Sequence, residues 1–138
     1  MRQAFHTVTV KTNGPGLYEF TQALEKFLSD EKARDGLVTC FIRHTSASLL
    51  IQENADPDVQ KDLQSFFAHL AKNGMNYRHT AEGPDDMPSH IRAALTATSI
   101  AIPVRRGKPV LGTWQGLYVF EHRDVPYTRD VLLHFIGD

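Results

Sequence analysis

Hydrophobic and polar residues alternate near the start of the chain, where Val8 and Val10 lie on one face of a predicted strand over residues 5–12. The breakers Asn-Gly-Pro-Gly at residues 13–16 end this strand. Apolar residues then recur every three or four positions, which predicts a helix over residues 17–28. Runs of β-branched and apolar residues predict further strands at residues 37–43, 47–53, 99–104, 112–122 and 131–136.

The clearest helix signal begins at Asp56, which precedes a proline as a helix N-cap precedes a first-turn proline. An apolar stripe at helical spacing covers residues 59–70, and Asn73-Gly74 ends it. Residues 75–87 are polar, rich in turn formers and without periodicity. Because so long a connection is uncommon in a small domain, we expect this loop to carry a function.

The predicted elements mix hairpin-like and crossover connections. Pro88 is expected to open a short third helix ahead of the later strands. This order predicts an α+β fold with one large mixed, mostly antiparallel sheet and helices packed largely on one face. The chain has 138 residues, which is within the range of one domain, and no repeat divides it. We therefore expect a single domain over residues 1–138.

Composition narrows the function classes. Apolar residues make up 41% of the chain and charged residues 22%, with a formal net charge of -1. The sequence is therefore neither disordered by composition nor basic enough to suggest nucleic-acid binding. No apolar run approaches the roughly 20 residues that span a bilayer, so no membrane partner is expected. The single cysteine, Cys40, lies in an apolar stretch and fits a reducing, cytoplasmic setting.

Three residues around the long loop are candidate metal ligands. His79, Asp86 and His90 combine imidazole and carboxylate donors, which are natural ligands for zinc or another divalent ion. Asp86 and His90 are four residues apart, a spacing that places two side chains on one helical face. The spacing matches no closed zinc motif, and Asp86 stands just as plausibly as a helix N-cap, so both interpretations stay open.

Polar groups also gather where the strand at residues 37–43 ends. His44 precedes Thr45-Ser46-Ala47-Ser48, a cluster suited to acid–base work or to phosphate oxygens, although such hydroxyls often bond their own backbone. His44 with Ser46 or Ser48 also raises a serine-hydrolase hypothesis, but no G-x-S-x-G elbow is present. Arg129 precedes the last strand and is a candidate anion ligand. Gln115 follows Trp114 in a glycine-flanked segment and either faces a cleft or pairs structurally.

Three segments together resemble one family, the YjbQ family. They are HTSASLLIQENADPDV (residues 44–59), HTAEGPDDMPSHI (residues 79–91) and SIAIPVRRGKPVLGTWQGLYVFEHRD (residues 99–124). The last contains the pattern S-x2-I-x-V-x2-G-x4-G-T-W-Q-x-L over residues 99–117, which is similar to that family's signature. The resemblance extends over nearly the whole chain.

The resemblance implies a trimer-forming α+β fold and a secondary thiamine-phosphate synthase activity. In that reaction a thiazole nitrogen displaces pyrophosphate from a hydroxymethylpyrimidine, so the site must neutralise the leaving group. Arg129 and a metal held by the histidine loop are expected to do so. The resemblance raises a set of site residues: His44, His79, Asp86, His90, Gln115 and Glu121.

Two hypotheses follow. The first is a metal-assisted enzyme, using zinc or magnesium, that acts on a small phosphorylated molecule with His44, Ser46, Gln115 and Glu121 as catalytic candidates. The second is a non-catalytic protein that binds a small anion or metabolite in the same cleft. In either case, the expected assembly is a homotrimer.

Overall fold

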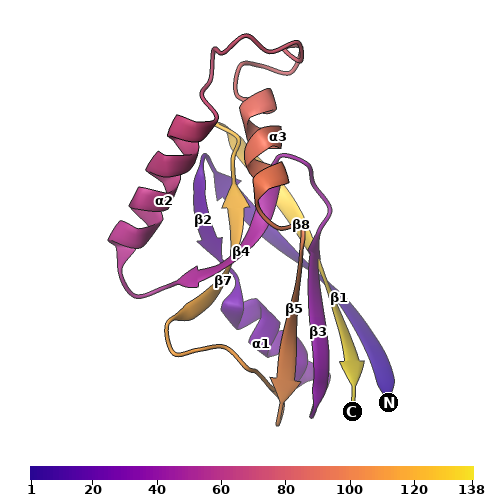
Figure 1. Ribbon diagram of the computed structural model, residues 1–138. Coiled ribbons are helices and arrows are strands. Elements are labelled where there is room, and N and C mark those ends of the chain that lie inside the picture. Colours follow the sequence, from indigo (N-terminus) through magenta and orange to yellow (C-terminus); the bar gives the residue numbers. More distant parts are fainter.

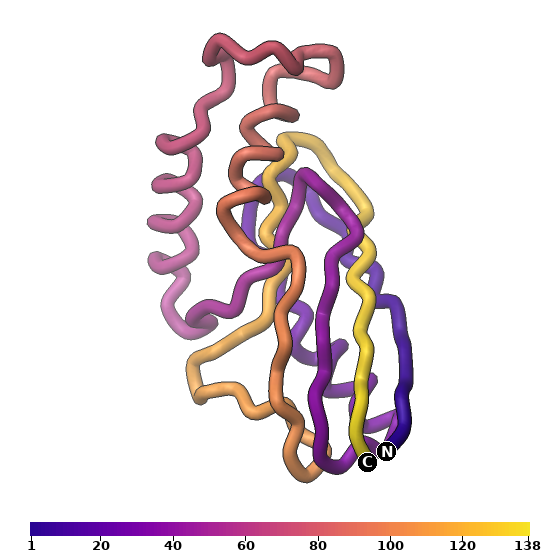
Figure 2. Tube along the Cα trace, turned by 45° about the vertical axis from the view of Figure 1, so that its right-hand side comes forward, coloured from indigo at the N-terminus to yellow at the C-terminus, as the bar shows by residue number.

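The larger of two sheets has five strands, and the computed structural model describes every residue from Met1 to Asp138. The order across this sheet is β1 (Arg2–Asn13), β8 (Pro126–Gly137), β3 (Gly36–Ile42), β5 (Ser99–Arg105) and β6 (Lys108–Pro109) (Figure 1). The register of β1 on β8 is unbroken from Arg2 opposite Gly137 to Asn13 opposite Pro126. The two ends of the chain therefore lie side by side (Figure 2).

The smaller sheet has three strands in the order β2 (Gly16–Glu19), β7 (Gln115–Glu121) and β4 (Ala47–Glu53). Every strand pair in both sheets is antiparallel. The predicted α+β class is confirmed, but two antiparallel sheets replace the single mixed sheet that we expected. The links at residues 43–46 and 122–125 each lead from a strand of one sheet to a strand of the other. Neither link therefore joins two parallel strands of the same sheet, as a mixed sheet requires.

Three helices complete the fold: α1 (Thr21–Asp30), α2 (Pro57–Leu70) and α3 (Asp86–Leu95). Alternate residues of β7 face opposite sides: Leu117 and Val119 enter the core, while Phe120 packs edge-on against Phe67 of α2. The three-stranded sheet is thus covered on both faces, which explains why nearly all of β7 is buried. None of the three helices is long and apolar enough to cross a membrane.

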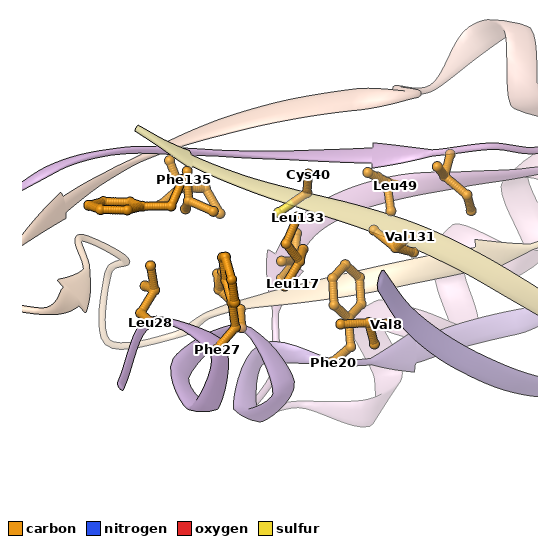
Figure 3. Close-up of a cluster of buried hydrophobic side chains, with 14 of the residues drawn as sticks. Val8, Phe20, Phe27, Leu28, Cys40, Leu49, Leu117, Val131, Leu133 and Phe135 are labelled. Atoms are coloured by element: carbon orange, nitrogen blue, oxygen red, sulfur yellow. The ribbon is translucent and has the colours of Figure 1, made fainter. Parts of the chain in front are cut away.

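The hydrophobic core lies between the two sheets and α1, which contributes Phe27 and Leu28 (Figure 3). The five-stranded sheet contributes Leu133 and Phe135 from β8. Cys40 of β3 is buried among them as a free thiol, and burial raises its pKa to about 12. This thiol is therefore protonated and unreactive at neutral pH.

Most element boundaries match the prediction, and Asp56 caps α2 by accepting a hydrogen bond from the Asp58 N–H at 2.9 Å. The predicted helix at residues 17–28 begins only at Thr21, because residues 16–19 pair with β7 as β2. The segment at residues 112–114 is a turn and not strand, since the Gln115 N–H donates back to the Gly112 carbonyl at 3.1 Å. The last strand begins at residue 126, five residues earlier than expected.

Candidate metal centre and adjoining cleft

The long loop and the first turns of α3 bring four donor side chains together: His79, Glu82, Asp86 and His90. One ligand atom from each lies within 4.8 Å of all the others. His79 Nε2 is 2.6 Å from Asp86 Oδ2, and His90 Nε2 is 3.0 Å from the same oxygen. The three predicted ligands therefore converge, and Glu82 joins them.

A backbone contact fixes which nitrogen of His90 faces this cluster. His90 Nδ1 lies 2.8 Å from the Thr45 carbonyl oxygen, which can only accept a hydrogen bond, so Nδ1 carries the proton. In the neutral ring, Nε2 then has a free lone pair directed at Asp86. Two acceptors this close need a proton or a cation between them. The same arrangement, a ring N–H held by a carbonyl, orients histidine ligands in known metal sites.

The carboxylate at the centre of the cluster is held from its other side by Arg123. Arg123 Nη1 donates to Asp86 Oδ1 at 2.6 Å, and Arg123 Nε donates to Asp85 Oδ2 at 2.9 Å. Burial would raise the pKa of Asp86, but the hydrogen bond with His79 and the nearby positive charges outweigh it and lower the pKa to about 2. Asp86 is therefore ionised. It is the first residue of α3, whose N-cap position is Asp85, so the N-cap interpretation of Asp86 is wrong.

Charge in the cluster also affects His79. Its hydrogen bond to Asp86 raises the pKa of His79 above the ordinary histidine value, with Glu82 acting in the same direction. A raised histidine pKa means that protons and cations compete for the same nitrogen near neutral pH. The cluster thus attracts positive charge, either as a proton or as a metal cation.

The donor set fits a divalent cation. In a tetrahedral centre with bonds of about 2 Å, neighbouring ligand atoms lie about 3.3 Å apart. The 2.6 and 3.0 Å contacts at Asp86 Oδ2 are a little shorter, as hydrogen bonds are, and the whole set stays within 4.8 Å. A small outward movement of the two rings would thus create metal-binding distances. Two imidazoles and one or two carboxylates suit zinc, and the oxygen donors also suit magnesium.

A second group of predicted residues meets where the two sheets join. Arg129 of β8 donates to both oxygens of Glu121, at 2.6 Å from Nε and 2.5 Å from Nη2. Thr12 of β1 donates to the same carboxylate at 2.7 Å. Although burial would raise the pKa of Glu121, the bonds from Arg129 and Thr12 lower it. Glu121 is fully buried and fully engaged, so its role here is to hold Arg129 in place.

Arg129 in turn faces His44. The Asp130 N–H donates to His44 Nε2 at 2.9 Å, so the neutral ring carries its proton on Nδ1. That nitrogen lies 3.3 Å from Arg129 Nη1, which is also a donor. Burial and the positive charge of Arg129 lower the pKa of His44. Two donors therefore stand side by side without an acceptor between them, an arrangement that suits a bound anion.

This donor pair lines a cleft of about 470 Å³. A smaller hollow of about 230 Å³ shares His44, Thr45 and Thr98 with it and reaches His90. The cleft therefore connects the Arg129 region to the edge of the candidate metal centre. Its polar lining comes from Arg43, His44, Thr45, Ser46, Thr98 and Arg129.

Of the remaining predicted site residues, Ser46 lines the cleft, whereas Gln115 lies apart from it. Gln115 is exposed at the far end of β7 from Glu121, and its side chain accepts from the Gly112 N–H at 2.7 Å. Ser46 Oγ accepts from Arg129 at 3.0 Å, whereas Ser48 is buried against His122 at 2.9 Å. Neither serine forms a hydrogen bond with His44, so the geometry gives no support to the serine-hydrolase hypothesis.

Three residues of the centre were not predicted from the sequence: Glu82, Asp85 and Arg123. Glu82 lies three residues after His79. This spacing brings two side chains together only where the backbone turns, and the sequence of this loop does not show where it turns. Arg123 is 37 residues from Asp86 along the chain. No local pattern predicts such a contact, because it depends on how β7 approaches α3.

The fold and this geometry define an α+β protein with a candidate metal centre of histidine and carboxylate donors beside a basic cleft. The family described as "UPF0047 protein YjbQ-like" matches residues 6–138. The chain belongs to this family, and the resemblance seen in its sequence is confirmed.

Similar proteins span the same length. A UPF0047 protein of Synechocystis sp. is 49% identical over 138 residues, which is 99% of this chain and 94% of that protein. The UPF0047 protein YjbQ of Escherichia coli O157:H7 is 40% identical over 96% of each chain. A crystal structure of a YjbQ/UPF0047 family protein from Clostridium acetobutylicum superposes with a TM-score of 0.88 at 34% identity, over 95% of this chain and 99% of the other.

Proposed function

We propose that the protein is a metal-assisted enzyme acting on a small phosphorylated molecule. The observation that carries the proposal is the orientation of His90, whose Nδ1 is held by the Thr45 carbonyl so that Nε2 points at the ionised Asp86 beside His79. A bound divalent cation would supply positive charge for a phosphate or a departing pyrophosphate. Zinc and magnesium are the ions that the donor set favours.

The cleft supports the choice of substrate class. Arg129 and His44 present adjacent donors, and Arg43, Thr45 and Ser46 add further groups that bind phosphate oxygens. Since the smaller hollow beside the cleft reaches His90, a phosphorylated molecule that occupies both would contact the basic residues with one end and lie beside the metal centre with the other. His44 is the titratable side chain best placed to take or give a proton there.

Thiamine-phosphate synthesis is the specific reaction that we propose to test first. A thiazole nitrogen would form a bond to the methylene carbon of the pyrimidine while the bond from that carbon to the pyrophosphate oxygen breaks. The protein would need to orient two substrates and to neutralise pyrophosphate, with little covalent chemistry of its own. Arg129, His44 and the residues of the metal centre are suited to that task.

The decisive experiment is elemental analysis of protein purified without a histidine tag. We expect near-stoichiometric divalent metal in the wild type and in His69→Ala, a matched control in which an exposed histidine of α2 is removed. His79→Ala and His90→Ala should each lose the metal and the release of pyrophosphate from the two thiamine precursors. Metal content that is unchanged in both variants would contradict the proposal.

The second candidate is a non-catalytic protein that binds a small anion in the same cleft. It is favoured by the lining of the cleft, which contains no carboxylate to act as an acid or base. This candidate predicts that phosphorylated ligands raise the melting temperature without being converted. Product formation with loaded wild-type protein would exclude it.

We also propose that the protein works as a homotrimer in a reducing, cytoplasmic setting. The unreactive Cys40 thiol is compatible with such a setting. The outer face of the five-stranded sheet supports an assembly, because Phe5, Phe41 and Ile136 are exposed on it. A neighbouring subunit that covers this face would remove apolar surface from water.

A further inference from the structure

A cavity of about 510 Å³ lies on the other side of α3 from the metal centre. It is lined by residues of α2, by Arg92 of α3, and by Phe120, Glu121 and His122 at the end of β7. The Glu121 carboxylate is already paired with Arg129. His90 and Arg92 are two residues apart, so their side chains leave α3 on nearly opposite faces. Figures 1 and 2 show α2 and α3 near each other, joined by the long loop.

Arg92 is the unusual residue in this cavity. Its side chain is only 8% exposed, and Nη2 donates to the Ala71 carbonyl at 2.5 Å. Its Nε is the one buried side-chain nitrogen or oxygen atom of the molecule without a hydrogen-bond partner. The other buried arginine, Arg129, and the partly buried Arg123 are paired with carboxylates, whereas Arg92 forms no ion pair.

An uncompensated buried charge is strongly unfavourable, and so proteins usually supply a partner for it. Asp124 also lines the cavity, but its carboxylate accepts from the Asn73 side chain at 3.2 Å and lies beyond ion-pair distance of Arg92. Burial lowers the pKa of Arg92, as expected for a guanidinium whose charge is poorly balanced. An anion in the cavity would provide the missing negative charge.

The other residues that line the cavity indicate which chemical group carries the anion. Phe67 and Phe120 meet edge to face at 5.3 Å and form an apolar wall, while Lys72 and Asn73 add a cation and an amide near Arg92. The volume lies within the usual range for small-molecule sites. No residue of α2 is buried, so this helix encloses space beside β7 without filling it.

We propose that this cavity is a second ligand site, which binds a phosphate group carried on an apolar ring with Arg92 as its main anchor. The phosphate accepts from the Arg92 guanidinium and from Lys72, and the ring lies against Phe67 and Phe120. This site is independent of the metal centre, because neither His79 nor His90 contributes to its lining.

Phenyl phosphate is the probe, titrated into metal-free protein by calorimetry and followed by backbone amide NMR. We expect saturable binding with the largest shifts at residues 71–73 and 92–93. Inorganic phosphate, which lacks the ring, should bind about tenfold more weakly. No saturable binding of phenyl phosphate up to about 10 mM would overturn the proposal.

Two variants locate the ligand. Arg92→Gln removes the anchor charge, and Ala68→Trp fills the cavity from the exposed surface of α2 without touching the core. Each should weaken phenyl phosphate binding about tenfold or more, whereas Lys26→Ala, which removes an exposed cation from α1, should leave it unchanged. Unweakened binding in either folded variant overturns the proposal. If Arg92→Gln fails to fold, Ala68→Trp alone decides.

Discussion

Single atoms of two histidines define the chemistry of the cleft and the metal centre. The Thr45 carbonyl fixes the proton of His90 on Nδ1, and the Asp130 N–H fixes the proton of His44 on Nδ1 as well. In His90 the free lone pair then faces a carboxylate, whereas in His44 the N–H faces a guanidinium. One ring is thus prepared for a cation and the other for an anion.

Metal affinity should increase with pH. The bond to Asp86 raises the pKa of His79 above its ordinary value of 6.5, so a proton must leave this ring before a metal binds. Below the raised pKa, each pH unit of acidification should weaken zinc binding about tenfold through this one proton. Competition with a zinc-binding dye between about pH 8 and pH 6 measures the slope. Equal affinity across that range would show that His79 is not a ligand.

Acid stability should depend on His122. Burial lowers the pKa of this ring to about 3, far below its unfolded value near 6.5. The ring is neutral when folded, so its contribution is complete above about pH 6.5 and is lost, by about 1.4 kcal/mol per pH unit, as the pH falls.

Urea unfolding of wild type and His122→Asn between about pH 6.5 and pH 5 isolates this effect, since most carboxyl groups titrate lower. His44 titrates in the same direction but is present in both proteins, so it cancels in the difference. The stability advantage of the wild type should shrink on acidification. Parallel curves for the two proteins would contradict the assignment.

At the level of elements, one ion pair joins the two sheets. Glu121 ends β7 of the three-stranded sheet, and Arg129 belongs to β8 of the five-stranded sheet. Thr12 of β1 ties a third strand to the same carboxylate. The cleft lies at this junction, so the pair that connects the sheets also sets the position of the Arg129 guanidinium in the cleft.

Removing one partner of the Glu121–Arg129 ion pair should therefore strongly destabilise the fold. Glu121→Gln would leave the buried Arg129 charge unpaired, and we expect a loss of about 3–5 kcal/mol in the free energy of unfolding. Asp30→Asn, which breaks the exposed pair with Lys26, should cost less than about 1 kcal/mol. Urea denaturation measures both, and equal losses would mean that Glu121 does not hold the sheets together.

Local signals predicted elements well and contacts between elements poorly. The Asp56 cap and the stripe of α2 were visible because helix ends and faces are encoded within a few residues. The convergence of His79, Asp86 and His90 was anticipated because all three lie within twelve residues of the chain. The contact of Arg123 with Asp86 depends on the packing of two distant elements, and so no local pattern predicts it.

At the scale of the whole molecule, the outer face of the five-stranded sheet is apolar and is not covered by any helix. Leu37 is paired with Ile136 and Phe41 with Leu132, so these side chains share one face and form an apolar surface across β3 and β8. Phe5 adds to it from β1, where it stacks on His134. A face of this kind on an antiparallel sheet is normally covered, by helices or by another subunit. In this fold α1 covers only the opposite face.

If further copies of the chain cover this apolar face, the protein in solution should have the mass of an oligomer. Light scattering of the wild type should give about three times the 15.5 kDa of one chain. Phe41→Lys places a charge at the centre of the apolar face, and desolvating that charge at an interface is unfavourable, so this variant should be monomeric at micromolar concentration. Phe66→Lys is the matched control, since Phe66 is 60% exposed on α2, away from the sheet. It should remain trimeric. A monomeric wild type would contradict the trimer, and dissociation in the Phe66 variant alone would place the subunit interface away from the five-stranded sheet.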